Sequence, residues 1–335
     1  MKAMVLAAGL GLRMRPLTLM RAKPVLPVLD RPLLQFTLER LAKAGVRDVV
    51  VNLHHLPDSV IDAVGTGRGL GLRIHYSFER EILGTGGGPR AARDFFGREP
   101  FLLVNGDVYF DFELRALVAR HSASGALATL ALRAQPDTGA YSSVVTDRRG
   151  RILSIGGRPR PGEGTVSMFA GVHVLGAQLL DRLPPGPSDS VRDLYVPLLR
   201  EGAHLAGVRC TGAWYDFGRP ALYRDAQLRM LRGRGRGQIL LGSRARIAAA
   251  AVVRRSVLGA GSRVARAARV GRSVLWPDAA VEHGARVAGS IVTSGGVVRT
   301  GERAEDVIVL PLAALGPGDR AGVERHGDMA WVGIE

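Results

Sequence analysis

Cysteine and long apolar runs are scarce in this 335-residue sequence, and each absence excludes a class of protein. Cys210 is the single cysteine, so no internal disulfide can form and a reducing compartment is favoured. No stretch is apolar enough to span a bilayer. Gly9, Gly11 and Arg13 interrupt the N-terminus where the apolar region of a secretory signal would continue. We therefore expect a cytoplasmic protein without membrane insertion.

Lysine and aromatic residues are also rare, which bears on the strongly positive charge. The formal net charge is +16, yet Lys2, Lys23 and Lys43 are the only lysines, and the arginines are spread along the whole chain. The one local cluster, Arg229–Arg236, contains no aromatic residue that would stack on bases. We expect no nucleic-acid partner, although the excess charge would attract anionic substrates.

The first two thirds of the chain alternate apolar segments of strand length with helical patterns. Leu34, Leu38 and Leu41 have helical spacing, and Gly45 ends that pattern. Alternation of this kind predicts an α/β fold with a mostly parallel sheet, in which ligands bind beyond the carboxyl ends of the strands. The predicted strands are Ala3–Ala7, Asp48–Leu53, Arg73–Tyr76, Phe101–Asn105 and Leu127–Leu132.

A different pattern begins at Ile239, where aliphatic positions repeat every 17 residues. Ser256-Val-Leu, Ser273-Val-Leu and Ser290-Ile-Val share this spacing (273 − 256 = 290 − 273 = 17). Two aliphatic columns repeat with the same period: Ile247, Val264, Val281 and Val298, and Val253, Val270 and Val287. Three inward aliphatic residues per period predict a triangular parallel β-helix built from hexapeptide-like repeats.

Glycines and fixed cations follow the first predicted strand, in the segment LAAGLGLRMRPLTLMRAKPVLPV. Gly9 and Gly11 allow the main chain to approach a ligand and expose its N–H groups, while Arg13 and Lys23 supply positive charge. This is neither a dinucleotide fingerprint, which needs glycine where Met14 stands, nor a Walker loop. The segment predicts phosphoryl-group chemistry.

Four motifs in order resemble the sugar-1-phosphate nucleotidylyltransferases, in which a C-terminal left-handed β-helix is common. Their G-x-G-x-R, P-L-T and K-P signature begins here at Gly9 and ends at Pro24. The resemblance continues through Leu83–Gly87, Asn105-Gly-Asp107 and Gly212–Gly218. It implies a Rossmann-like catalytic domain that joins a nucleoside triphosphate to a sugar-1-phosphate and releases pyrophosphate.

The resemblance also assigns roles to individual residues. Arg13 would hold the β- and γ-phosphates, and Lys23 would lie near the α-phosphate or the incoming phosphate. Asp107 and Asp216 would coordinate Mg²⁺, a cation that prefers carboxylate oxygens. Leu6–Gly9 and Glu81–Thr85 would read base and ribose, mainly through backbone groups. The predicted nucleotide-binding residues are Leu6, Ala7, Ala8, Gly9, Gly11, Glu81, Gly84, Thr85 and Gly106.

The sugar pocket departs from the family pattern. Where the family has E-K-P, N-A-G and Y-G, this chain has Gly157-Arg158-Pro159, Phe169-Ala-Gly171 and Tyr141-Ser142. Tyr141, Arg158 and Gly171 are the predicted sugar-phosphate residues, with Arg158 replacing the lysine. The β-helix and Glu81–Thr85 favour a mannose-1-phosphate guanylyltransferase-like enzyme. An N-acetylmuramate-1-phosphate uridylyltransferase or another NDP-sugar synthase is the alternative.

We expect a catalytic domain at 1–230, a linker at 231–238, a left-handed β-helix at 239–315 and a C-terminal tail at 316–335. The β-helix would mediate assembly into a homo-oligomer. Two other classes of function stay open. Hexapeptide β-helices often carry acyltransfer, for which His283 is the one histidine within 239–315. A non-catalytic regulatory subunit of the same fold is the second.

Overall fold

The computed structural model describes residues 1–134, 141–159, 163–232 and 236–334. The chain divides into two compact units, the first formed by Met1–Leu10 and Leu34–Tyr215, the second by Gly11–Leu33 and Asp216–Glu335. The glycine-rich segment, residues 6–28, therefore belongs with the C-terminal part of the chain from Gly11 onwards. The domain boundaries given above stay a prediction, and residues 233–235 of the expected linker lie outside the described residues.

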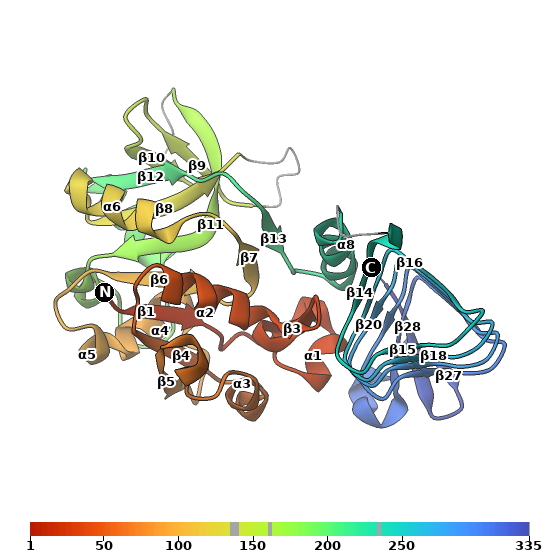
Figure 1. Cartoon of the computed structure of the whole chain (residues 1–335). Helices are drawn as coiled ribbons and strands as arrows, with labels where there is room; N and C mark the ends of the chain where they lie inside the picture. Colours follow the sequence, from red (N-terminus) through yellow and green to blue (C-terminus); the bar gives the residue numbers. More distant parts are fainter. Residues whose placement is uncertain (135–140, 160–162, 233–235, 335) are drawn as a thin grey trace. The chain divides into compact units, whose positions relative to one another are not determined.

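A nine-stranded sheet forms the centre of the first unit, in the order β10-β9-β11-β6-β1-β4-β5, with β8 paired to β11 and β12 to β8 (Figure 1). Its strands are β1 (Ala3–Leu6), β4 (Asp48–Leu53), β5 (Arg73–Phe78), β6 (Phe101–Asn105), β8 (Ala128–Arg133), β9 (Ser143–Thr146), β10 (Ile152–Ile155), β11 (Thr165–Leu175) and β12 (Leu205–Arg209). The two-stranded sheet beside it pairs β7 (Val108–Phe110) with β13 (Trp214–Asp216).

The predicted α/β fold is confirmed, and the sheet is mixed rather than uniform. β1 runs parallel to β4 and β6, and β4 runs parallel to β5. Strands β1, β4 and β6 are apolar along most of their length, as expected where both faces are covered. β11 is antiparallel to β6, β8 and β9, and the parallel order ends at this long strand.

Helices surround the sheet and close a core in which Phe96 stacks on Phe101 with ring centroids 3.7 Å apart. α2 has the predicted helical face, and Gly45 follows it with φ +91°, a conformation that suits glycine. The helices and helical turns of this unit are α2 (Leu33–Lys43), α3 (Pro57–Val64), η3 (Arg68–Leu70), α4 (Gly84–Ala91), α5 (Arg93–Phe96), α6 (Leu114–Ser124), η4 (Ala177–Arg182), η5 (Val191–Tyr195) and α7 (Val196–Arg200).

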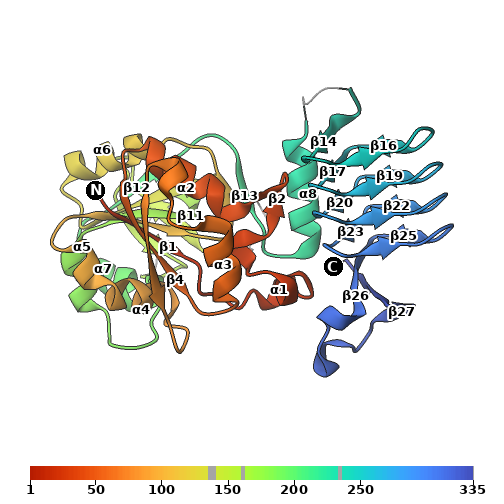
Figure 2. The same cartoon turned by 60° about the horizontal axis from the view of Figure 1, so that its bottom comes forward.

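The predicted hexapeptide β-helix is confirmed in the second unit, where successive coils stack in register (Figure 2). Val264 pairs with Val281 and Val281 with Val298, as the 17-residue period requires. The first of its three sheets holds β14 (Ile239–Leu241), β17 (Ser256–Leu258), β20 (Val274–Leu275), β23 (Ile291–Val292) and β26 (Val307–Pro311). The other two are β15 (Arg246–Ile247), β18 (Arg263–Val264), β21 (Ala280–Val281) and β24 (Val297–Val298); and β16 (Val252–Arg254), β19 (Arg269–Gly271), β22 (Arg286–Ala288) and β25 (Arg303–Glu305).

The repeated serines form a buried ladder that explains why a polar residue recurs in this core. The Ser256 and Ser273 hydroxyls accept the N–H groups of Ser273 and Ser290 at 3.2 and 3.1 Å, one coil further on. The C-terminal strands β27 (Glu324–His326) and β28 (Met329–Gly333) close the last coil. Trp331 packs into the β-helix core and its ring stacks on His326.

The rest of the second unit is short segments and one long helix, α8 (Pro220–Met230). None of the helices in the described part of the chain combines the length and apolar character needed to cross a bilayer. The short segments are η1 (Leu12–Met14), α1 (Leu17–Met20), η2 (Lys23–Val25), β2 (Pro27–Val28), β3 (Arg31–Pro32), η6 (Arg236–Gln238), η7 (Leu312–Ala314) and η8 (Pro317–Asp319).

Candidate functional site

The carboxyl ends of β1 and β6 lie side by side, with Leu6 paired to Asn105. The Gly106 N–H donates to the Leu6 carbonyl at 2.9 Å, and a Cβ at Gly106 would lie 2.6 Å from that oxygen. Only glycine fits this close approach. The first part of the glycine-rich segment and the residue before Asp107 therefore lie at one edge of the sheet, where α/β proteins bind ligands.

A buried polar chain connects the loop after β1 with the loop before α4. The Ala7 N–H donates to Oδ1 of Asn52 at 2.7 Å, and the Asn52 amide donates to Oε1 of Glu79 at 2.7 Å. The second Glu79 oxygen accepts the Leu83 N–H at 2.9 Å. Asn52 and Glu79 are 2% and 7% exposed, so these bonds are sheltered from water. These hydrogen bonds hold the two segments predicted to bind the base, Leu6–Gly9 and Glu81–Thr85, in place relative to each other.

The glycines of α4 allow close packing against residues 186–190. A Cβ at Gly84 would lie 2.6 Å from the Ser188 carbonyl oxygen, and one at Gly87 would lie 2.3 Å from the Gly186 carbonyl oxygen. The Thr85 hydroxyl accepts the Ser190 N–H at 2.9 Å and donates to Asp189 at 3.1 Å. Thr85 thus ties the helix start to this segment through its side chain. Glu81 is exposed in the loop before it.

The predicted sugar-side residues gather around Trp214, apart from Arg158. Gly171 has φ +75° and touches Asn105, from which a Cβ would be 2.9 Å away. The Trp214 indole N–H donates to the Ala170 carbonyl at 3.0 Å, and its ring meets Tyr141 edge-on with centroids 5.4 Å apart. Tyr141, Trp214 and Gly171 therefore form one surface next to the Asn105-Gly-Asp107 motif.

Arg158 lies at the end of a tight turn after β10. Its N–H and carbonyl both bond Ile155, and Gly156 and Gly157 have φ +59° and +73°, as a two-residue hairpin turn of this kind requires. The Arg158 side chain is exposed. The glycine that stands where the family has glutamate is thus needed by the turn itself. The phosphate role of Arg158 stays a prediction.

In the second unit, the three signature motifs of the glycine-rich segment pack on one another. Gly11 has φ +62°, and a Cβ there would lie 2.7 Å from Thr18 and 3.3 Å from the Lys23 Cβ. The Thr18 hydroxyl donates to the Gly11 carbonyl at 2.9 Å. Lys23 is 8% exposed, whereas Arg13 is exposed. The segment therefore presents one sheltered and one open cation on a rigid turn.

Asp107 directly precedes β7 and Asp216 ends β13, the strand paired with β7. Two carboxylates fit Mg²⁺, which is usually held by one or two carboxylates together with substrate phosphates and water. Across the described ranges, no group of three or more His, Cys, Asp or Glu side chains is arranged to hold a metal ion. The metal assignment stays a prediction.

The predicted site residues are distributed over both units. The second unit holds Gly11, Arg13, Lys23 and Asp216; the first holds Leu6, Ala7, Ala8, Gly9, Glu81, Gly84, Thr85, Gly106, Asp107, Tyr141, Arg158 and Gly171. Sequence reasoning missed Asn52 and Glu79. The one available signal was a polar residue near the end of each of two strand-like segments.

Comparisons with known proteins agree with this architecture. The profile described as nucleotidyl transferase matches residues 2–233, and the one described as a GlmU-like C-terminal hexapeptide matches residues 234–309. A solved structure of a putative glucose-1-phosphate thymidylyltransferase from Bacillus anthracis superposes with a TM-score of 0.59. At 20% identity it covers 71% of this chain and 98% of that one, and it supports the fold.

Two proteins that are named as nucleotidyltransferases are similar to this chain in sequence. A UTP–glucose-1-phosphate uridylyltransferase of Synechocystis is 32% identical over 241 residues, covering 68% of this chain and 62% of that protein. A mannose-1-phosphate guanylyltransferase of Mycobacterium tuberculosis is 32% identical over 244 residues, covering 72% and 68%. The chain thus spans less than two thirds of the Synechocystis relative. The chain belongs to the nucleotidyl transferase family.

Proposed function

We propose that this protein is a sugar-1-phosphate nucleotidylyltransferase, which makes an NDP-sugar and pyrophosphate from a nucleoside triphosphate and a sugar-1-phosphate. The observation that carries the proposal is the contact of Gly106 with the Leu6 carbonyl. It sets the start of the glycine-rich segment beside the residue that precedes Asp107. A loop with open backbone groups and an adjacent carboxylate are what binding of a metal-complexed triphosphate needs.

The reaction is an in-line attack of a sugar-phosphate oxygen on the α-phosphorus, and pyrophosphate leaves. All reacting groups are anionic, so the protein contributes alignment and charge neutralisation. The Arg13 guanidinium is suited to the β- and γ-phosphates, and the sheltered Lys23 ammonium to the α-phosphate or the incoming phosphate. Mg²⁺ held by Asp107 and Asp216 would supply further charge stabilisation at the phosphates.

The base and ribose would lie against the two loops that Asn52 and Glu79 connect. These loops contain Leu6–Gly9 and Glu81–Thr85, whose backbone groups are the proposed hydrogen-bonding partners. Fixed loops favour recognition because little ordering is left to occur when the nucleotide binds. The exposed Glu81 is the side chain best suited to contact a donor group on the base.

The sugar-1-phosphate would bind at the surface formed by Tyr141, Gly171 and Trp214, with Arg158 as the phosphate ligand. The preferred product is GDP-mannose. The two relatives are equally identical to this chain, at 32%, but the match covers 68% of the mannose-1-phosphate guanylyltransferase and 62% of the uridylyltransferase. A uridylyltransferase acting on N-acetylmuramate-1-phosphate, or another NDP-sugar synthase, is the alternative. The active form of the enzyme would be a homo-oligomer in the cytoplasm.

A panel of four nucleoside triphosphates against several sugar-1-phosphates, followed by pyrophosphate release, tests this function. We expect one base and one sugar to give turnover far above the rest, with GTP and mannose-1-phosphate the first pair to examine. A regulatory subunit of the same fold would release no pyrophosphate with any pair. Such a result, obtained with Mg²⁺ and with Mn²⁺ present, would reject the proposal.

A further inference from the structure

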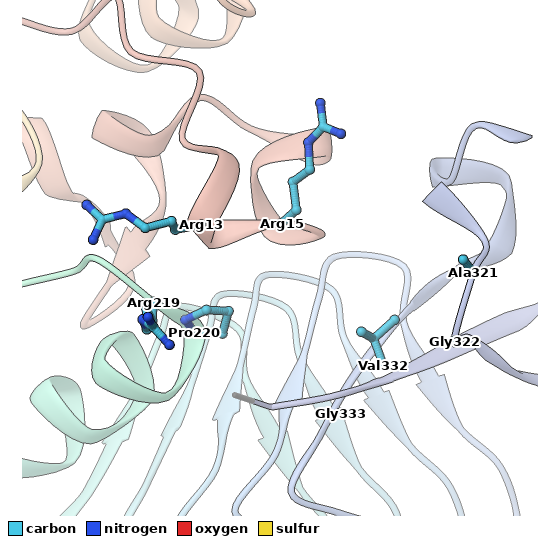
Figure 3. A pocket seen from close by; sticks show the side chains of 8 residues that line it. All are labelled: Arg13, Arg15, Arg219, Pro220, Ala321, Gly322, Val332 and Gly333. Atoms are coloured by element: carbon cyan, nitrogen blue, oxygen red, sulfur yellow. The ribbon is translucent and has the colours of Figure 1, made fainter. Parts of the chain in front are cut away.

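Three arginines line a pocket in the second unit, at the side of the glycine-rich segment. The pocket has a volume of about 520 Å³, inside the range of roughly 300–1,000 Å³ usual for small-molecule sites. Among the described residues that line it, every charged side chain is an arginine. The lining residues are Arg13, Arg15, Arg219, Pro220, Ala321, Gly322, Val332 and Gly333 (Figure 3).

The backbone around the arginines is well fixed. Arg13 lies in η1, where the Met14 N–H donates to the Gly11 carbonyl at 2.8 Å and the Met14 side chain is fully buried. Arg219 precedes the buried Pro220 at the start of α8. In Figure 3, Arg13 and Arg219 lie on the same side of the pocket, whereas Arg15 extends in another direction. Two cations from segments about 200 positions apart in the sequence thus line one cavity.

The opposite wall comes from the C-terminal strands. Val332 and Gly333 pair with β26 in the last coil of the β-helix, so this wall is anchored. Arg15 donates to Asp319 at 3.0 Å, which ties η1 to the segment just before Ala321. Ala321, Gly322 and Gly333 have little or no side chain and leave the space between the walls open. Because Asp319 neutralises Arg15, the charge left for a ligand belongs to Arg13 and Arg219.

The residues next to Arg219 in the sequence indicate which anion would bind. Asp216, the proposed metal ligand, stands three positions before it. Arg13 is the proposed ligand of the β- and γ-phosphates. Guanidinium groups match phosphate oxygens with paired hydrogen bonds, and several such groups favour a polyphosphate over a monovalent anion. A polyphosphate brings enough negative charge to compensate both arginines.

We infer that this pocket is a polyphosphate site in which Arg219 acts with Arg13. This inference rests on the proposed function, since the reaction supplies such an anion as the triphosphate tail and the leaving pyrophosphate. A free phosphate-bearing effector has the same chemistry and is the second source. Neither the G-x-G-x-R motif nor the aspartates assign any role to Arg219 or to the C-terminal strands.

Titration calorimetry of the full-length protein with inorganic pyrophosphate tests the site without turnover. Arg219→Gln should weaken pyrophosphate binding roughly tenfold to hundredfold, as expected for a charged hydrogen-bonding partner. Arg219→Lys should restore part of the affinity. The matched control is Arg269→Gln, which removes the same charge from an exposed position on β19, outside the pocket. The control should bind as the wild type does, and all variants should share its melting temperature.

Competition identifies the source of the anion. If the pocket takes the reaction's own phosphates, pyrophosphate and a non-hydrolysable triphosphate displace each other, and Arg219→Gln weakens both. If the pocket takes a free effector, pyrophosphate and the triphosphate analogue bind at the same time, and Arg219→Gln weakens only pyrophosphate binding. Unchanged pyrophosphate affinity in Arg219→Gln would overturn the site. If the substrate panel still gives NDP-sugar in that case, the proposed function stands and only this inference fails.

Discussion

Asn52 shows how one buried side chain can determine the geometry of a ligand site that it does not line. It accepts from Ala7 and donates to Glu79, which in turn accepts from Leu83. Asn52→Leu removes both partners' bonds and leaves Glu79 buried with an unsatisfied oxygen, at a cost of about 1–3 kcal/mol. We expect the KM for the nucleoside triphosphate to rise about tenfold or more in steady-state kinetics, with the KM for sugar-1-phosphate little changed. Equal increases in both constants would contradict this positioning role.

His173 should make the free energy of unfolding depend on pH. It is fully buried against Tyr195, with Nδ1 and the hydroxyl 2.5 Å apart, and burial lowers its pKa to about 3. In the unfolded chain its pKa is about 6.5, so protons bind the unfolded state first. The stabilisation is therefore complete above about pH 6.5 and decreases as the pH falls towards 3.

From pH 7 to pH 5 this one residue should lower the free energy of unfolding by about 2 kcal/mol. Urea titrations at both pH values measure the change. His173→Gln keeps a polar partner for Tyr195 but has no titrating group, so it should lose about 2 kcal/mol less than the wild type over this interval. If both proteins lose the same stability, the buried neutral histidine is not the cause.

At the scale of elements, the β2–β3 hairpin shows how the glycine-rich segment is attached to the β-helix. Its turn residues Leu29 and Asp30 have φ +49° and +62°, unusual for side chains of this kind, and each has a fixed partner. The Leu29 N–H donates to Gln227 at 2.9 Å, and Asp30 accepts the Ala260 N–H at 2.8 Å. Burial raises the Asp30 pKa, which the Ala260 N–H partly opposes.

Asp30→Ala should lower the free energy of unfolding by about 1 kcal/mol or more, because the Ala260 N–H loses its acceptor. Asp30→Asn is the matched control, since it keeps the acceptor oxygen without the buried charge and should be at least as stable as the wild type near neutral pH. Chemical denaturation of the three proteins gives the comparison. An Asn variant as unstable as the Ala variant would show that the charge matters more than the hydrogen bond.

The periodic elements were predictable from the sequence because their residues repeat a local rule. The 17-residue spacing gave the strand register of Val264, Val281 and Val298, and the apolar segments gave β4 and β6 to the residue. The antiparallel direction of β11 was not predicted, since it depends on which strands β11 pairs with and not on its own pattern. Asn52 and Glu79 were missed for a similar reason. Their bonds join positions 27 residues apart that only the folded sheet brings together.

At the scale of the whole molecule, the β-helix packs against the segment that carries two of the proposed catalytic residues. Tyr223 donates to the Pro27 carbonyl and accepts the indole N–H of Trp276 at 3.0 Å, and the Arg21 guanidinium lies over the Trp276 ring. The segment that carries Arg13 and Lys23 is thus packed on α8 and the β-helix. The first fold unit alone lacks the cations proposed for catalysis.

A 1–230 truncation should therefore lose most of its turnover as well as its self-association. Light scattering should give the full-length protein a mass above that of one chain, and the truncation a lower mass. Trp276→Phe is a milder variant that removes the indole N–H donor and part of the buried ring, and it should stay assembled while turnover falls. A truncation as active and as stable as the full chain would show that the β-helix does not support the glycine-rich segment.

The proposed reaction is the transfer of a nucleotidyl group, with charge stabilisation by Asp107 and Asp216. Phosphorus NMR of the reaction with Mg²⁺ tests it most directly, because it resolves the triphosphate, the sugar-1-phosphate, the NDP-sugar and pyrophosphate together. We expect one pyrophosphate per NDP-sugar in the wild type, no conversion after chelation of the metal, and at least about a hundredfold slower conversion in Asp107→Asn and in Asp216→Asn. Conversion at the wild-type rate by either variant, or cleavage of the triphosphate without formation of an NDP-sugar, would contradict it.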